Sequence, residues 1–223
     1  MKTKNISRAF QLIQFFFWSL VIFLSFALIY HIISFYNFQT DLDFFRERER
    51  NLDNPLWKFA VYLHVTGGML CLLSAIPTFI PFVLRHYPYF HTIMGKIYVI
   101  VVLGAVVPSG LYLSFYSDAT VYLGIWAEIR FLLLGTALFY TTWKAYVLIT
   151  KGEVHAHCDW MIRSYALALV TLTFRTLVTI NSNLFHIESS RNVLFSLWIS
   201  LALNILLAEA VIKWKSWGNR LYI

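Results

Sequence analysis

The stretch WKFAVYLHVTGGMLCLLSAIPTFIPFVL, residues 57–84, decides the fold. After Lys58 it contains no Asp, Glu, Lys or Arg. It contains one histidine, His64. A helix rises about 1.5 Å per residue, so about 20 apolar residues are enough to cross the hydrocarbon core of a bilayer. The stretch therefore predicts a membrane-spanning helix.

Similar apolar runs recur along the chain, so one span becomes several. Of the 223 residues, 59% are hydrophobic and only 13% are charged, against about 25% charged residues in soluble domains. We predict one all-α domain, residues 1–223, that forms an integral membrane bundle of six helices. A five-helix bundle would result if the first run were a cleaved signal, but that run is long and lacks a small-residue cleavage site. The predicted spans are about 10–36, 57–84, 92–115, 121–149, 158–182 and 192–213.

The net charge of +7 is explained by its distribution along the chain. With the N-terminus inside, eleven Lys and Arg residues fall on the cytoplasmic side and five fall outside, and Arg130 and Arg175 in the membrane complete the 18. Such a bias is the positive-inside pattern of multi-pass membrane proteins. It predicts an inner (plasma) membrane protein with both termini in the cytoplasm. The lipid bilayer, and not nucleic acid, is then the partner of the basic side chains.

Among the ionisable side chains within the predicted spans, His64, Arg130 and Arg175 lie well inside otherwise apolar stretches. An ionisable group in the hydrocarbon layer is costly and marks a candidate functional site. Counted from the outer ends of the predicted spans, all three lie roughly 10–14 Å deep. Small residues share helical faces with His64 and Arg175, which predicts that both point into the bundle.

We therefore predict one buried, partly positive pocket in the outer half of the bundle, lined by His64, Arg130 and Arg175. Guanidinium groups bind carboxylates and carbonyl oxygens well, so a quinone head group or porphyrin propionates would suit this pocket. The alternative is an internal polar network that fixes the register of the helices.

A second cluster lies in RHYPYFHTIMGKIY, residues 85–98, and KGEVHAHCDWMIRSY, residues 151–165. His91 and His157 begin two predicted spans at the cytoplasmic boundary, so they approach each other if these helices pack. Two imidazoles from facing helices suit a bis-histidine haem, and His155 or Asp159 would add the third ligand of a divalent metal.

For a haem, the side chains predicted to line a flat apolar slot beside these histidines are Tyr98, Trp160 and Met161. The alternative for the whole cluster is that boundary histidines cap helices and contact lipid head groups.

Three motifs resemble a known family: HVTGG at 64–68, LRHYPYFHTIMGKIYV at 84–99 and HCDWMIRSYALALVTLTFR at 157–175. The family is the uncharacterised group of multi-pass bacterial membrane proteins catalogued as domain of unknown function 2306. The resemblance covers about residues 60–180. It implies no activity, but it selects the side chains of His64, His91, His157, Arg163 and Arg175.

The best functional hypothesis from the sequence is a redox membrane protein that binds haem b or a quinone and exchanges electrons with a membrane redox partner. The alternative is a non-enzymatic accessory subunit or a small-molecule transporter. Whether the protein is an enzyme stays open at this point, because no Ser/His/Asp arrangement is evident.

Overall fold

The computed structural model describes residues 15–30, 53–116, 124–186 and 189–220. This part of the chain is helical and contains no β-strand, which confirms the predicted all-α membrane bundle. The five helical segments long and apolar enough to cross a membrane are Pro55–Thr78, Pro88–Phe115, Ile125–Thr150, Val154–Phe185 and Arg191–Trp214.

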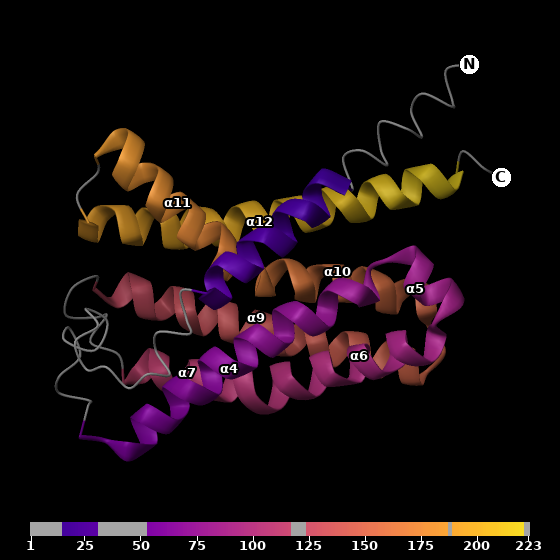
Figure 1. The fold of residues 1–223 in the computed structure, drawn as a ribbon, viewed down its shortest axis with the longest axis horizontal. Coiled ribbons are helices and arrows are strands. Elements are labelled where there is room, and N and C mark those ends of the chain that lie inside the picture. The colour runs from indigo at the N-terminus through magenta and orange to yellow at the C-terminus, as the bar shows by residue number, and fades with distance from the viewer. Residues whose placement is uncertain (1–14, 31–52, 117–123, 187–188, 221–223) are drawn as a thin grey trace.

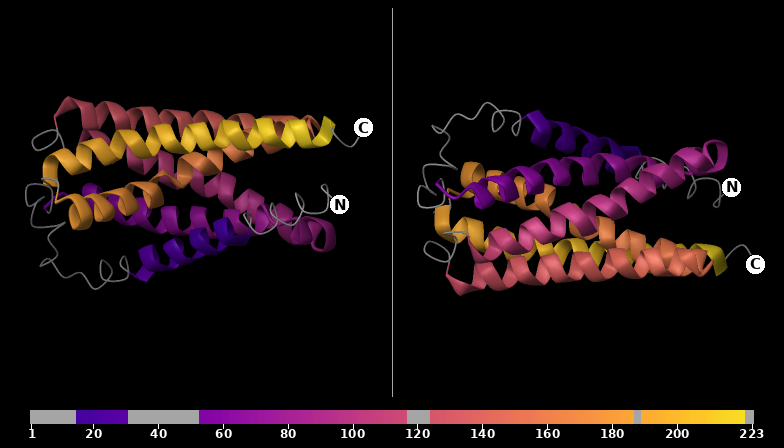
Figure 2. Two further views of the ribbon diagram at one scale, coloured as in Figure 1. Left: turned by 90° about the horizontal axis from the view of Figure 1, so that it is seen from above. Right: turned by 90° about the horizontal axis from the view of Figure 1, so that it is seen from below.

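The predicted span 10–36 appears as a shorter apolar helix, Phe15–Tyr30, and the rest of that span lies outside the described residues. The predicted number of six spans is therefore approximate. The views in Figure 2 place this short helix at one edge of the bundle, whose long helices run roughly along a common axis.

The predicted span 57–84 is interrupted. Helix α4, Pro55–Thr78, ends before a second short helix, α5, Pro81–His86. Ile80 has an extended backbone (φ −89°, ψ 114°). Because the ring of Pro81 disfavours the helical conformation of the residue before it, the helix cannot run through this position. We call the end of the bundle that carries α5 the α5 end (Figure 1).

The next span contains a wider turn. It consists of α6, Pro88–Val101, a π-helical turn η1, Val102–Val106, and α7, Val107–Phe115. Pro108 has no N–H for the carbonyl of Gly104, four residues earlier. A π-turn just before the proline lets the helix continue with a changed hydrogen-bond pattern.

The remaining helices complete the bundle. They are α9, Ile125–Thr150; α10, Val154–Ala168; α11, Val170–Phe185; and α12, Ser189–Arg220. Helix α10 packs mainly on α9, α4 mainly on α6, and α11 mainly on α12. The starts of α6 and α10 lie at the α5 end with the C-terminal end of α12, and the Phe15–Tyr30 helix begins toward that end (Figure 1).

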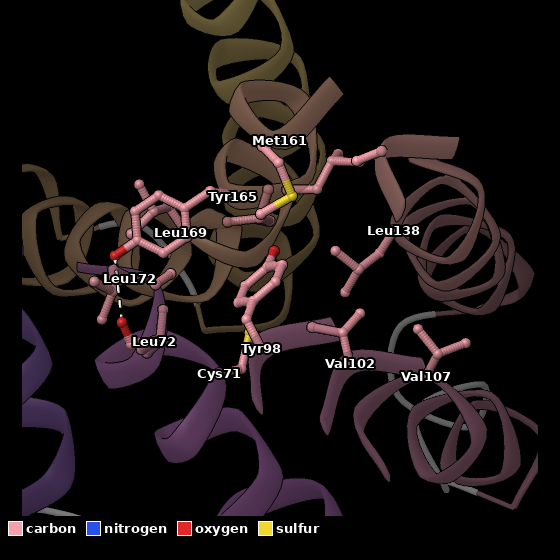
Figure 3. Packing of buried hydrophobic residues seen from close by; sticks show 14 of the residues in the cluster. Cys71, Leu72, Tyr98, Val102, Val107, Leu138, Met161, Tyr165, Leu169 and Leu172 are labelled. Atoms are coloured by element: carbon pink, nitrogen blue, oxygen red, sulfur yellow. Dashed lines mark hydrogen bonds between the residues drawn. The ribbon is translucent and has the colours of Figure 1, made fainter. Parts of the chain in front are cut away.

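The core lies where α4, α6, α9 and α10 meet. Tyr98 and Val102 are completely buried there beside Cys71, Tyr165 and Met161, as Figure 3 shows. The rings of Tyr165, Phe79 and Trp18, the last from the short N-terminal helix, form a cluster. The centroid of Tyr165 lies 5.1 Å from Phe79 and 6.1 Å from Trp18, and Trp18 and Phe79 lie 5.8 Å apart. This aromatic packing holds the short helix on the bundle.

Candidate functional site

His91 and His157 occupy equivalent places on two parallel helices. Tyr98 follows His91 on α6 by seven residues, and Ser164 follows His157 on α10 by seven. The Tyr98 hydroxyl and Ser164 Oγ are hydrogen-bonded at 2.7 Å. Seven residues are nearly two helical turns, so each histidine lies on the face that makes this contact, nearer the α5 end.

The orientation of His157 is fixed by the main chain of α9. Its Nδ1 lies 2.8 Å from the carbonyl oxygen of Ala145. A carbonyl can only accept, so Nδ1 carries the proton and donates it to this bond. Nε2 is then a lone-pair acceptor that no described residue bonds. Histidines that bind metals or accept protons are commonly held in this way by a second-shell carbonyl.

His91 carries a buried nitrogen that lacks a partner. Its ring lies beside the backbone carbonyl of Thr78, the last residue of α4. Its Nδ1 is buried and has no hydrogen-bond partner among the described residues. Buried polar atoms are nearly always hydrogen-bonded, so an exception of this kind marks a place for a ligand or water.

The predicted metal ligands are not gathered into one cluster. Among the described residues, no three His, Cys, Asp or Glu side chains are grouped so that they could hold a metal ion. His155 is exposed, and Asp159 interacts with the guanidinium of Arg163. The metal set of His91, His157, His155 and Asp159 stays a prediction that requires movement of side chains.

The side chains predicted to line a haem slot are packed together. Tyr98 is fully buried and Met161 is 7% exposed, both within the core of Figure 3. The Trp160 ring meets the Tyr140 ring edge-on at 5.4 Å and lies under the Arg163 guanidinium at 4.8 Å. A porphyrin beside His157 would have to displace these contacts.

Arg163, which the family resemblance selected as a candidate site residue, is paired within the chain. Its Nε and Nη2 donate to the two carboxylate oxygens of Glu209 at 2.6 and 3.1 Å. This forked ion pair joins α10 to α12. Sequence reasoning missed Glu209, although it is the only acidic residue in the predicted span 192–213 and the rule for ionisable groups in membranes applies to it.

His64 is seated against the π-turn. Its Nδ1 lies 3.0 Å from the carbonyl oxygen of Val106 and 3.2 Å from Ser109 Oγ. A Cβ added at Gly110 would lie 2.8 Å from the imidazole Cε1. The ring therefore requires a residue without a side chain at this position.

Arg130 and Arg175 lie in different surroundings. Arg130 is 3% exposed, and its Nε donates to the carbonyl of Leu197 on α12 at 3.1 Å. Arg175 on α11 is exposed, and no described residue forms a hydrogen bond or ion pair with its guanidinium. The hydrogen bonds of His64 and Arg130 run to different helices, so the pocket predicted to unite all three residues stays a prediction.

The predicted orientation of Arg175 was wrong. It shares an exposed stripe of α11 with Thr171, Thr179 and Ser182, whereas Ser164, placed on the same predicted face, is completely buried. The helix is interrupted at Leu169, between α10 and α11. A stripe drawn across this interruption does not keep facing one neighbour.

Comparison with protein families identifies the chain. The family model described as predicted membrane protein, DUF2306, matches residues 61–212. The chain therefore belongs to this family, which confirms the resemblance seen in the motifs and extends it into α12. No curated protein and no solved structure matches the chain.

Proposed function

We propose that this member of the DUF2306 family is a multi-pass inner-membrane protein that binds a redox-active quinol or quinone head group between His91 and His157. The observation that carries this proposal is the buried Nδ1 of His91, which has no partner among the described residues. His91 lies on the face of α6 that contacts the α10 face of His157, whose Nε2 is also unbonded there.

The chemistry of the two nitrogens favours a quinol. A quinol presents hydroxyl donors. His157 Nε2 is an acceptor because Nδ1 carries the proton, and His91 Nδ1 is an acceptor in the tautomer that carries its proton on Nε2. Oxidation of a quinol to a quinone releases two protons and two electrons. The lone pair of each acceptor nitrogen can take one of the two protons. The electrons require a membrane redox partner that accepts them.

A haem b is the runner-up ligand for the same pair. Two imidazoles are enough to hold its iron, and no third ligand is needed. The packing of Tyr98 and Met161 favours the quinol, because a flat macrocycle needs more room beside the histidines than one ring does.

We further propose that the α5 end, and with it the histidine pair, faces the cytoplasm. The Lys and Arg distribution supports this orientation. The Phe15–Tyr30 helix begins toward that end and α12 ends there, which agrees with both termini on one side (Figure 1). Reporter fusions at Asp118 and at the C-terminus should report opposite sides, and a result on the same side would contradict this topology.

The test of the ligand is the cofactor content of the protein purified in mild detergent. Bound quinone is extracted and quantified by chromatography, and haem is detected by its Soret band. We expect quinone in the wild type and loss of most of it in His91→Ala and His157→Ala. His155→Ala is the matched control, because His155 is an exposed histidine on the same helix.

Each other outcome overturns the quinol proposal in a defined way. A Soret band that His157→Ala abolishes would assign the pair to haem. Preparations free of both quinone and haem would favour the non-enzymatic accessory subunit or small-molecule transporter. Equal quinone content in all three variants would place the quinone elsewhere.

A further inference from the structure

The most deeply buried arginine of the described residues, Arg130, lacks a counter-charge. Arg130 is 3% exposed between α9 and α12. Its Nε donates to the Leu197 carbonyl at 3.1 Å, and its Nη2 approaches Ser200 Oγ at 3.5 Å. Both acceptors are neutral. No carboxylate among the described residues pairs with this guanidinium.

The contrast with Arg163 makes this arrangement informative. Arg163 has a side chain that is 27% exposed, and it has a forked ion pair with Glu209. Arg130 is more deeply buried and has only uncharged partners. A guanidinium stays charged in proteins, and a buried charge without a partner costs several kcal/mol. The contacts with Leu197 and Ser200 use two of its five N–H donors, so donors remain for a further ligand.

The side chain of α12 that meets Arg130 is polar. It is Ser200, which is completely buried. The Ser200 hydroxyl donates to the Leu197 carbonyl at 3.0 Å in the absence of another acceptor. A hydroxyl rotates freely, so the same group can donate to an anion beside the guanidinium.

From this geometry we infer a binding site for one singly charged anion at Arg130, between α9 and α12, with Ser200 as a second donor. One guanidinium compensates one negative charge, which favours chloride or a carboxylate over a phosphate dianion. The anion comes from one of two sources: a small ion from the solvent, or the carboxylate of an amphiphile dissolved in the membrane. The site is separate from the His91–His157 pair and does not depend on its ligand.

The experiment measures thermal unfolding of the full chain in a non-ionic detergent at constant ionic strength. Gluconate, which is bulky and strongly hydrated, serves as the reference anion, and chloride, formate and oleate are titrated against it. Oleyl alcohol is the uncharged control for oleate. We expect a saturable rise in Tm, because a ligand that binds only the folded state stabilises it by mass action.

Substitutions locate the effect. Arg130→Gln should raise the half-saturating anion concentration at least about tenfold, which corresponds to about 1.4 kcal/mol. Arg175→Gln is the matched control, since it removes an exposed arginine of the neighbouring helix, and it should respond like the wild type. If Arg130→Gln does not fold, Ser200→Ala serves instead, and it should weaken the response severalfold with Arg130 in place.

The outcomes decide both the site and its source. A response to chloride and formate assigns a small solvent ion. A response to oleate at far lower concentrations than to formate, without one to oleyl alcohol, assigns an amphiphile. A Tm that is the same in every anion overturns the proposal, and so does a wild-type response in Arg130→Gln or in Ser200→Ala.

Discussion

The core beneath the histidine pair and the α11–α12 hairpin are built by different means. Around Tyr98 the helices are joined by large apolar and aromatic side chains that fill the space between them (Figure 3). Between α11 and α12 the contacts are made largely by amides and hydroxyls. Asn192 alone donates to the Val178 carbonyl and to Ser182 Oγ, at 3.0 and 2.8 Å.

This difference shows how a helix is held where lipid surrounds it. Lipid tails are as apolar as leucine, so burial of apolar surface gives helices little reason to associate. Close packing and interhelical hydrogen bonds remain. The core uses close packing. Helix α11, which packs mainly on α12, depends on interhelical hydrogen bonds. The loss of a single hydrogen bond should therefore matter more in the hairpin than in the core.

The largest effect is expected from Tyr98→Ala. It removes a fully buried ring from the core, and such a cavity costs about 3–5 kcal/mol. The measurement is the free energy of unfolding in mixed micelles titrated with a denaturing detergent. Tyr98→Phe is the control that removes only the hydroxyl bonded to Ser164, and it should cost about 1 kcal/mol or less. Equal losses in the two variants would break the comparison.

A smaller effect is expected from Asn192→Ala. Asn192 also accepts from Asn181 Nδ2 and Ser196 Oγ, both at 3.1 Å. Its loss removes three hydrogen bonds between α11 and α12. Interhelical hydrogen bonds in membranes contribute about 0.6 kcal/mol each on average, which gives a total of about 1–2 kcal/mol. The same titration measures it.

Asn183→Ala is the matched control for the hairpin, since Asn183 is an exposed asparagine of α11. It should leave the free energy of unfolding nearly unchanged. If Asn192→Ala were as neutral as Asn183→Ala, the hairpin would be held by packing like the core.

The smallest effect is expected from Glu209→Gln. The ion pair with Arg163 has good geometry, but its side chains are 27% and 41% exposed. Pairs of this kind contribute about 1 kcal/mol or less. A double-mutant cycle with Arg163→Gln isolates the pairwise free energy. A coupling above about 2 kcal/mol would show that the ion pair is shielded from solvent. It would sharpen the comparison, because ion pairs would then be a third kind of helix contact beside packing and neutral hydrogen bonds.

The spans could be predicted from the sequence, and their interruptions could not. Apolar runs of sufficient length locate five of the helices because the bilayer sets a minimum length. The end of α4 at Thr78 and the π-turn at Val102–Val106 depend on local backbone geometry, which hydropathy does not record. Pro81 and Pro108 were visible, but the consequence of each depends on its neighbours.

For the candidate site, the sequence located residues better than their partners. The positions of His91 and His157 at helix starts follow from the ends of the apolar runs. The partners of Arg163 and Arg130, Glu209 and Leu197, lie far along the chain and depend on which helices pack together. The direction of Arg175 could not be predicted, because the interruption at Leu169 carries no sequence signal as strong as a proline.

The π-turn before Pro108 has a consequence for the number of residues in this helix. A π-turn is equivalent to one residue inserted into an α-helix. If the same residues of Val102–Val106 wound as a regular α-helix, the whole segment beyond them would be rotated by about 100°. Ser109 and Gly110 would then turn away from His64. The seat of the histidine thus depends on how this helix winds as well as on the identity of its residues.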